Sequence, residues 1–183
     1  MGHTIRPMQE DDWSEIVEIY IQGIQSNNKT FEIECPSYEA WDKSHVKECR
    51  LVAEVDGEVA AWAALQPFSA QEHYKGVAEL SLYIDTNRNH KDIAEALLQA
   101  VVEESEKAGF WSLQAAVFES DASSIKLYEK CGFRMIGYRE RLAKDRFGVW
   151  RSIALMEHRI TSDIAGGCGD CPLIKAKARD SYA

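Results

Sequence analysis

Near the N-terminus, the pattern of apolar and polar positions predicts an edge strand followed by an amphipathic helix. His3 to Arg6 alternates between apolar and polar residues and stops at Pro7, which cannot donate a ladder hydrogen bond. The next apolar residues recur at helical spacing, and the acidic cluster at 10–12 suits a helix N-terminus. The helical positions are Trp13, Ile16, Val17, Tyr20 and Ile24.

The middle of the chain predicts a hairpin, a further strand and a long helix. Leu51 to Val55 and Glu58 to Leu65 are strand-like runs joined by an Asp-Gly pair, which strongly favours a hairpin. Val77 to Ile84 is the next predicted strand. Asp92 to Lys107 carries one apolar face and ends just before a glycine, as a helix does.

The remaining elements alternate between strand and helix. We predict a strand at Trp111 to Phe118, a helix capped by Ser120 or Asp121 and running to about Lys130, and two strands at Phe133 to Arg139 and Trp150 to His158 around a loop at Lys144 to Gly148. Long helices alternate with strands only in the second half. The order therefore predicts a mixed α/β (α+β) sheet and excludes a regular doubly wound fold.

Composition narrows the class of protein. The chain has 183 residues, enough for one domain with a sizeable core, and no apolar run approaches the roughly 20 residues that span a bilayer. The first residues are acidic and lack the apolar core of a signal peptide, so we expect a cytoplasmic protein without membrane contact. A formal net charge of -9 disfavours nucleic-acid binding.

The last residues differ in character from the rest. We expect residues 1–160 to form the domain and residues 161–183, which are rich in glycine and small polar residues, to form a loose tail. The tail holds Cys168 and Cys171 in a CxxC. With no second CxxC and no His-x-His cluster nearby, incidental reduced thiols are favoured over redox or metal regulation, and no metal site is expected.

Several spaced motifs carry a family resemblance. The segment SSIKLYEKCGFRMIGYRE (Ser123 to Glu140) is similar to a motif of the GNAT acetyltransferase superfamily. The runs EIVEIYIQGI, Thr30-Phe31-Glu32, AELSLYI and FGVW resemble its phosphinothricin acetyltransferase-like branch. The resemblance covers roughly residues 3 to 160.

The resemblance implies a fold and an activity. The expected fold is a central, mixed but mostly antiparallel twisted sheet flanked by helices. The expected reaction moves an acetyl group from acetyl-CoA to the primary amine of a small amino-acid-like acceptor, of the phosphinothricin or methionine sulfoximine type. Members of this branch typically form homodimers with the active site near the subunit contact, so we expect a homodimer.

The resemblance also implies two catalytic residues. Glu79, on the strand Val77 to Ile84, matches the glutamate that serves as base in the branch. Tyr128 matches the tyrosine that many family members place near the CoA sulfur, where a phenol can donate a proton. On residue type alone, a solvated, outward-facing strand residue is the favoured interpretation of Glu79, and Tyr128 can equally be a helix residue packed on the sheet.

The cofactor-binding residues fall on the same strand and on the last helix. The resemblance implies that backbone groups of Leu82, Tyr83 and Ile84 hold the acetyl carbonyl and the pantetheine arm, in an oxyanion-hole arrangement. Asp121 stands where relatives commonly carry an asparagine that touches the pantetheine arm. Asp121 is at least as well explained as a helix cap.

For the acceptor, the resemblance suggests residues from three segments. Tyr74 and Lys75 lie where relatives bear an aromatic residue and an arginine that hold the substrate carboxylate. Phe31 and Glu32 are expected to line the acceptor pocket, with Trp150 packed beside it. Each is otherwise ordinary surface or core.

The phosphate loop departs from the family pattern. Relatives carry Gln/Arg-x-x-Gly-x-Gly/Ala where this chain has Asn89, His90, Lys91, Asp92, Ile93 and Ala94, and only Ala94 fits. An aspartate at a helix N-terminus adds negative charge where an anion should bind. Either the enzyme binds acetyl-CoA through a modified, weaker site, or the scaffold has lost CoA and binds a small molecule or protein instead. The persistence of Glu79 and Tyr128 favours the first alternative.

Overall fold

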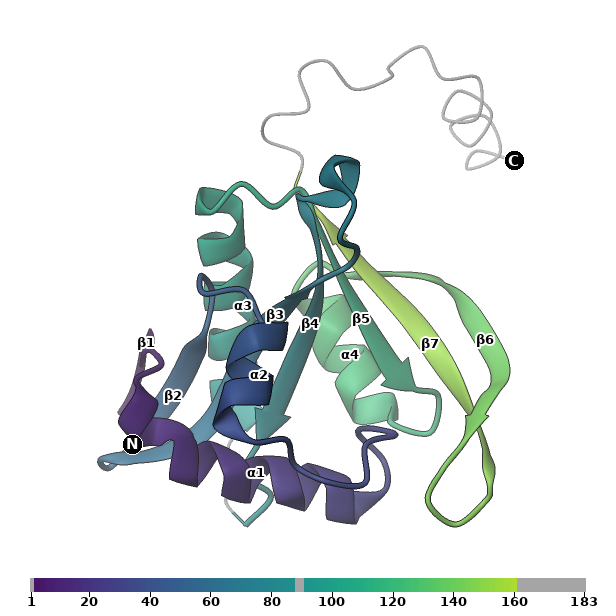
Figure 1. The fold of residues 1–183 in the computed structure, drawn as a ribbon, viewed down its shortest axis with the longest axis horizontal. Coiled ribbons are helices and arrows are strands. Elements are labelled where there is room, and N and C mark those ends of the chain that lie inside the picture. The colour runs from purple at the N-terminus through teal and green to yellow at the C-terminus, as the bar shows by residue number, and fades with distance from the viewer. Residues whose placement is uncertain (1, 88–90, 161–183) are drawn as a thin grey trace.

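The structure, a computed structural model, describes residues 2–87 and 91–160 (Figure 1). Its seven strands are β1 (His3–Pro7), β2 (Leu51–Val55), β3 (Glu58–Pro67), β4 (Val77–Ile84), β5 (Ser112–Phe118), β6 (Arg134–Lys144) and β7 (Trp150–Arg159). Its helices are α1 (Trp13–Ser26), α2 (Tyr38–Ser44), α3 (Lys91–Lys107) and α4 (Ala122–Lys130), with short 3₁₀ turns at Glu10–Asp12 and Glu72–Tyr74. The predicted tail with Cys168 and Cys171 lies outside the described residues.

The strands form one sheet in the order β1-β2-β3-β4-β5-β7-β6. Every neighbouring pair is antiparallel except β4 and β5, which are parallel. The predicted mixed and mostly antiparallel α/β sheet is therefore confirmed, and β1 lies at one edge as its short alternating pattern predicts.

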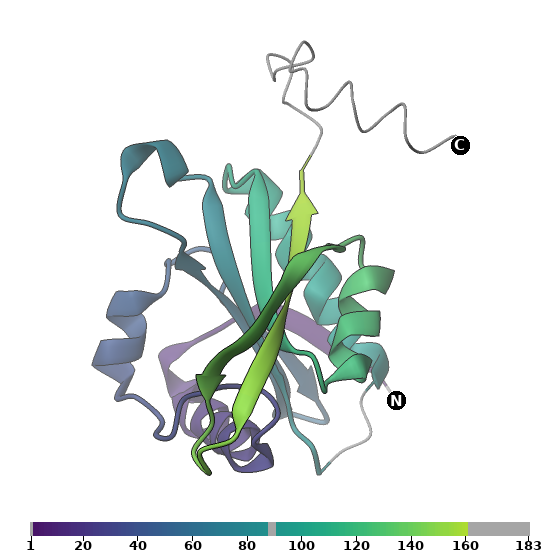
Figure 2. The ribbon, with the colours of Figure 1, turned by 90° about the vertical axis from the view of Figure 1, so that its right-hand side faces the viewer.

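Two layers of helix cover the sheet. Figure 2 shows α1 and α2 on one side and α3 and α4 on the other. The first side packs α1 and α2 against Val52, Trp62 and Ala64. The second side buries α3 and α4 against the remaining core residues of the sheet. Since both faces are covered, the central strands are apolar throughout, as in β3, where seven consecutive residues are buried.

An ion pair fixes the start of α1. Both terminal nitrogens of Arg6 donate to the carboxylate of Asp12, at 2.7 and 2.8 Å. The same carboxylate accepts from the backbone N–H of Gln9 at 2.8 Å. These hydrogen bonds, chiefly the one from Arg6, hold the pKa of Asp12 below its ordinary value. The first strand and the first helix are thus locked together.

Two elements differ from the sequence prediction. Helix α2 was not predicted because its seven residues are too short to show a clear period; Ser37 caps it by accepting from the N–H of Ala40. Strand β6 runs to Lys144, five residues beyond the predicted Arg139. Its last part is exposed and carries a register shift against β7, so it has no apolar alternation to read.

Strands β4 and β5 separate after a short paired stretch. Their ladder contains three pairs and ends at Glu79 and Gln114, so Leu80 to Ile84 and Ala115 to Phe118 have no pairing to each other. Figure 1 shows the two strands diverging from this closed end. The opening therefore lies in the middle of the sheet, with β1 to β4 on one side and β5, β7 and β6 on the other.

Within the described part of the chain, none of the helices is long and apolar enough to cross a membrane.

Candidate active site

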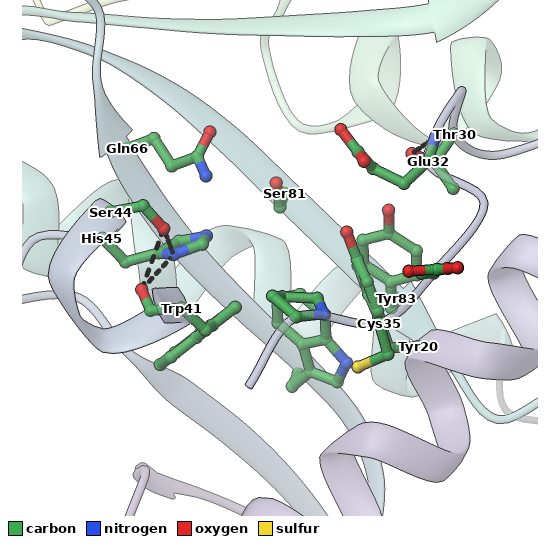
Figure 3. A pocket seen from close by; sticks show the side chains of 13 residues that line it. Tyr20, Thr30, Glu32, Cys35, Trp41, Ser44, His45, Gln66, Ser81 and Tyr83 are labelled. Carbon is green, nitrogen blue, oxygen red and sulfur yellow. Dashed lines mark hydrogen bonds between the residues drawn. The ribbon is translucent and has the colours of Figure 1, made fainter. Parts of the chain in front are cut away.

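The larger of two neighbouring hollows, here called the acceptor pocket, lies between α1, α2 and the face of β3 and β4 that they cover. Its volume is about 490 Å³. The lining residues are Tyr20, Thr30, Glu32, Glu34, Cys35, Pro36, Trp41, Ser44, His45, Trp62, Gln66, Ser81 and Tyr83. Figure 3 shows His45 and Gln66 on one side of it and Glu32 with Tyr20 and Tyr83 on the other.

Aromatic rings build one wall of the acceptor pocket. Trp62 and Tyr83 are cross-strand partners and their rings stack 4.7 Å apart at 12°. Tyr20, from α1, packs against both rings. Tyr83 can lie this close to α1 because Gly23 has no side chain; a Cβ there would stand 2.6 Å from the tyrosine ring. Burial raises the pKa of Tyr83, so its hydroxyl keeps its proton.

His45 forms the opposite wall. Its Nδ1 lies 2.8 Å from the carbonyl oxygen of Trp41, so Nδ1 carries the proton and Nε2 is free to accept one. The ring stacks on that of Trp41 at 4.3 Å. Burial holds the pKa of His45 below its ordinary value of 6.5, so the ring is neutral at pH 7. Nothing in residue spacing alone marked His45 as a site residue, because α2 itself was not predicted.

The smaller hollow, here called the donor cavity, lies in the opening between β4 and β5. Its volume is about 80 Å³. The lining residues are Asn28, Lys29, Leu80, Ser81, Leu82, Tyr83, Ala116, Val117, Phe118, Asp121, Ser124 and Tyr128. Ser81 and Tyr83 line both hollows, so the two spaces meet across one strand.

A polar cluster fills one end of the donor cavity. Asp121, only 4% exposed, caps α4 by accepting from the backbone N–H of Ser124 and from the hydroxyls of Ser123 and Ser124. Lys29 donates to the same carboxylate and to Ser124. Burial alone would raise the pKa of Asp121, but the bonds from Lys29 and the serines outweigh it and lower the pKa. Asp121 therefore carries a negative charge that is already fully partnered.

Tyr128 lies at the floor of the donor cavity, 5% exposed, with its ring against Phe133. Burial, together with the charge of Asp121, raises its pKa. The phenol therefore keeps its proton, and it is better suited to donating a hydrogen bond than to releasing a proton completely.

The structure places Glu79 at the closed end of the opening. It is exposed, and its cross-strand partner Gln66 lines the acceptor pocket. Since alternate residues share one face of a strand, Glu79 points to the same side as Ser81 and Tyr83. It is not among the residues that line the acceptor pocket itself. Leu82 and Tyr83 line the donor cavity, whereas Ile84 packs against the core.

Of the predicted acceptor residues, only Glu32 lines the acceptor pocket. Phe31 instead packs its ring 4.7 Å from Phe118, beside the donor cavity. Lys75 pairs with Glu72 at 2.8 Å. Tyr74 lies near Phe68, with ring centroids 5.5 Å apart.

Trp150 is 54% exposed at the start of β7, below the ammonium of Lys144, and does not line the acceptor pocket of the same subunit. It stands in the exposed β6–β7 hairpin.

The predicted phosphate loop is described only in part. Asn89 and His90 lie outside the described residues, and α3 begins at Lys91. Asp92 is exposed in the first turn of α3. Ile93 and Ala94 are 6% and 2% exposed in the core, so their side chains hold the helix to the sheet and only their backbone can face a ligand.

The fold thus has an opening between two parallel strands, and two hollows meet there. The sequence matches the model of the acetyltransferase (GNAT) family over residues 8–133, so the chain belongs to that family and is an acetyltransferase. Acetyl-CoA is the acetyl donor of the family.

Known relatives and structures are of the same kind. YwnH of Bacillus subtilis, provisionally named a phosphinothricin acetyltransferase, is 33% identical over 71% of this chain and 83% of its own length. The L-methionine sulfoximine/L-methionine sulfone acetyltransferase of Pseudomonas aeruginosa is 23% identical over 86% of this chain and 94% of its own. A GNAT superfamily phosphinothricin acetyltransferase from Sinorhizobium meliloti, solved in complex with acetyl-CoA, has a TM-score of 0.80 and 26% identity over 87% of this chain and 89% of its own.

Proposed function

We propose that this enzyme transfers the acetyl group of acetyl-CoA to the primary amine of a small amino-acid-like acceptor, with Glu79 as base and Tyr128 as donor to the leaving sulfur. The observation that carries the proposal is the shared wall: Ser81 and Tyr83 line both the acceptor pocket and the donor cavity. An amine in one space would lie next to a thioester in the other, and such proximity supplies much of the rate. The names of the relatives support the acceptor class.

The donor cavity suits the acyl end of acetyl-CoA. The ladder between β4 and β5 ends at Glu79, which leaves the edge of Leu80 to Ile84 available for a thioester carbonyl and an amide-bearing arm. Backbone donors aimed at a carbonyl oxygen stabilise the charge it gains during attack. When bound, acetyl-CoA supplies an activated acyl group. We assign Leu82 and Tyr83 to holding it.

Glu79 is suited to accept the proton of the acceptor ammonium. It is exposed, stands at the end of the strand face that lines the acceptor pocket, and neighbours Gln66, which lines that pocket. A carboxylate in this place reaches the amine through water. Tyr128 keeps its proton and donates a hydrogen bond to the sulfur as the carbon–sulfur bond breaks.

A direct test measures acetyl-CoA binding and CoA release separately. We expect acetyl-CoA to raise the melting temperature, and we expect CoA release with amino-acid-like amines to fall at least tenfold in Glu79→Gln and Tyr128→Phe, because acid–base groups contribute about 10²–10⁴-fold. Melting curves that do not respond to millimolar acetyl-CoA would contradict the proposal.

A second candidate function is a binding module on an acetyltransferase scaffold. Asp92 in the first turn of α3 and the Lys29–Asp121 ion pair in a cavity of only about 80 Å³ favour it, because both oppose cofactor entry. Binding of an amine without any binding of acetyl-CoA would select this candidate.

We also propose that two copies pair through the β6–β7 hairpin. Strand β6 is an edge of the sheet, and an exposed strand edge invites pairing. The hairpin and its neighbours expose Ile136, Tyr138, Leu142, Phe147, Val149 and Trp150. Light scattering of the purified protein tests the pairing; a monomer at all concentrations would contradict it.

A further inference from the structure

The charged groups of the acceptor pocket have one sign. Glu32 and Glu34, from the segment between α1 and α2, are the charged side chains of the described residues that line it. Both are exposed, so they remain in contact with solvent and with any ligand that enters. The other polar groups of the lining include the neutral side chains of Thr30, Ser44, Gln66 and Ser81 and the hydroxyls of Tyr20 and Tyr83.

Three cations from neighbouring segments are bound to other groups. Lys29 is bound to Asp121 on the donor side of β4. Arg50 lies over the ring of Trp41 and bonds to Asp42, and Lys75 is paired with Glu72.

His45 adds no positive charge at neutral pH. Among the described residues that line the pocket, it is the one side chain that can become cationic, and its Nδ1–H is committed to the carbonyl of Trp41. Burial lowers its pKa, so at pH 7 the ring is neutral.

The aromatic wall also favours a cationic ligand over an anionic one. The faces of Tyr20, Trp62 and Tyr83 carry the negative part of the ring quadrupole, which attracts a cation and repels an anion. An acceptor carboxylate in this pocket would meet two carboxylates and an aromatic wall, with only neutral donors to replace its water. A second ammonium would find both a counter-charge and aromatic faces.

From this lining we infer that the preferred acceptor is a small amine whose other end is also cationic, such as a diamine or a basic amino-acid-like amine, rather than one whose other end is anionic. The inference rests on the proposed acetyl transfer and specifies its acceptor. In the transfer, the reacting ammonium gives one proton to the base, its nitrogen bonds to the carbonyl carbon and the carbon–sulfur bond breaks. The nitrogen then loses its second proton as the amide forms, and the departing CoA thiolate takes up one proton and leaves as the thiol, so that one proton is released overall. The second ammonium takes no part and stays with Glu32 and Glu34.

The test uses three amines of equal length that differ only at the far end: 1,5-diaminopentane, 1-aminopentane and 5-aminopentanoate. We expect kcat/KM for CoA release to fall in that order, by about tenfold or more from first to last, which corresponds to about 1.4 kcal/mol. Phosphinothricin and methionine sulfoximine are run beside them. Equal rates, or a preference for 5-aminopentanoate, would overturn the inference while leaving acetyl transfer supported.

Matched variants locate the preference. Glu32→Gln and Glu34→Gln together should lower kcat/KM for 1,5-diaminopentane about tenfold and change that for 1-aminopentane much less. Glu103→Gln, an exposed carboxylate on α3 across the sheet, removes the same charge and should leave the order unchanged. An equal loss for all three amines in the double variant would contradict the charge argument.

Calorimetry separates this inference from the proposed reaction. The full chain is titrated with 1,5-diaminopentane and with 5-aminopentanoate without acetyl-CoA. Tighter binding of the diamine supports the inference even if no CoA is released with any amine, in which case the proposed reaction alone fails. Equal binding, or tighter binding of 5-aminopentanoate, overturns the inference.

Discussion

The acceptor pocket and the donor cavity share a wall but differ in almost every property. The acceptor pocket is roomy, at about 490 Å³, with an aromatic wall and two exposed acidic groups. The donor cavity is about 80 Å³, and its charged groups, Lys29 and Asp121, are bound to each other. The difference teaches that the two spaces are built differently: the amine side is an open acidic pocket, whereas the donor side is a narrow cavity with an ion pair at one end.

The largest loss of stability is expected from a substitution at the closed end of the opening between β4 and β5. The carbonyl of Gly76 accepts from the N–H groups of Trp111 and Ser112, and a Cβ on Gly76 would stand 2.0 Å from the Trp111 ring. Gly76→Ala should therefore lower the free energy of unfolding by about 2–3 kcal/mol, measured by urea denaturation. Gly2→Ala, with nothing within 4 Å, is the control. Equal free energies of unfolding for Gly76→Ala and Gly2→Ala would contradict this expectation.

The next largest change in stability is expected when the ion pair between Lys29 and Asp121 is broken. Lys29→Met leaves the buried carboxylate of Asp121 with hydroxyl and N–H partners but no cation. We expect a loss of about 2 kcal/mol in the free energy of unfolding. Asp121→Asn, tested beside it, keeps an oxygen for the cap and should cost less. If Lys29→Met is as stable as the parent protein, the ion pair does not hold this end of the cavity.

A smaller loss of stability is expected when the pH is lowered. Burial lowers the pKa of His45 and of His158, whose Nδ1 is buried without a hydrogen-bond partner in the described residues. Below about pH 6.5 the unfolded chain then binds more protons than the folded one, so stability is full above that pH and is lost as pH falls. We expect a drop of about 1–2 kcal/mol between pH 7.5 and 5.5 in urea denaturation.

Variants assign this pH dependence. His45→Gln should remove about half of the drop, because one of the two imidazoles with a lowered pKa is gone. His3→Gln, at an exposed position in β1, should remove none of it. A drop of the same size in His45→Gln would show that His45 is not its source.

The smallest effect is at the start of α3. Asp92 is exposed in the first turn, where a negative charge opposes an incoming anion by about 0.3–1 kcal/mol. Asp92→Gly should tighten acetyl-CoA binding by about two- to fivefold, measured by calorimetry, while Glu103→Gln at the other end of the helix should change it little. Unchanged affinity in Asp92→Gly would refute the charge argument.

Much of the fold was predictable because its patterns are local. The Asp-Gly pair predicted the β2–β3 hairpin, and the alternation of Val77 to Ile84 predicted β4 with its observed bounds. Helix α2 was missed because seven residues show too little periodicity. With it, sequence reasoning also missed Trp41 and His45.

The site was less predictable because it depends on distant pairings. The opening between β4 and β5 is a stretch where two strands do not pair, and no local pattern marks an absent pairing. Lys29 and Asp121 are 92 residues apart, so only the folded chain reveals their contact. Cap chemistry did suggest one role of Asp121, since an aspartate before a helix often accepts from its first N–H groups.

Strand β4 also couples the two hollows through alternate positions. The side chains at odd positions, Ser81 and Tyr83, line both hollows, whereas those at even positions, Leu80 and Leu82, line the donor cavity and pack against the core. A substitution at an even position can therefore reshape the donor cavity alone, whereas a substitution at Ser81 or Tyr83 changes both spaces at once. New acceptors are then most easily acquired through the residues of the acceptor pocket that lie outside this strand.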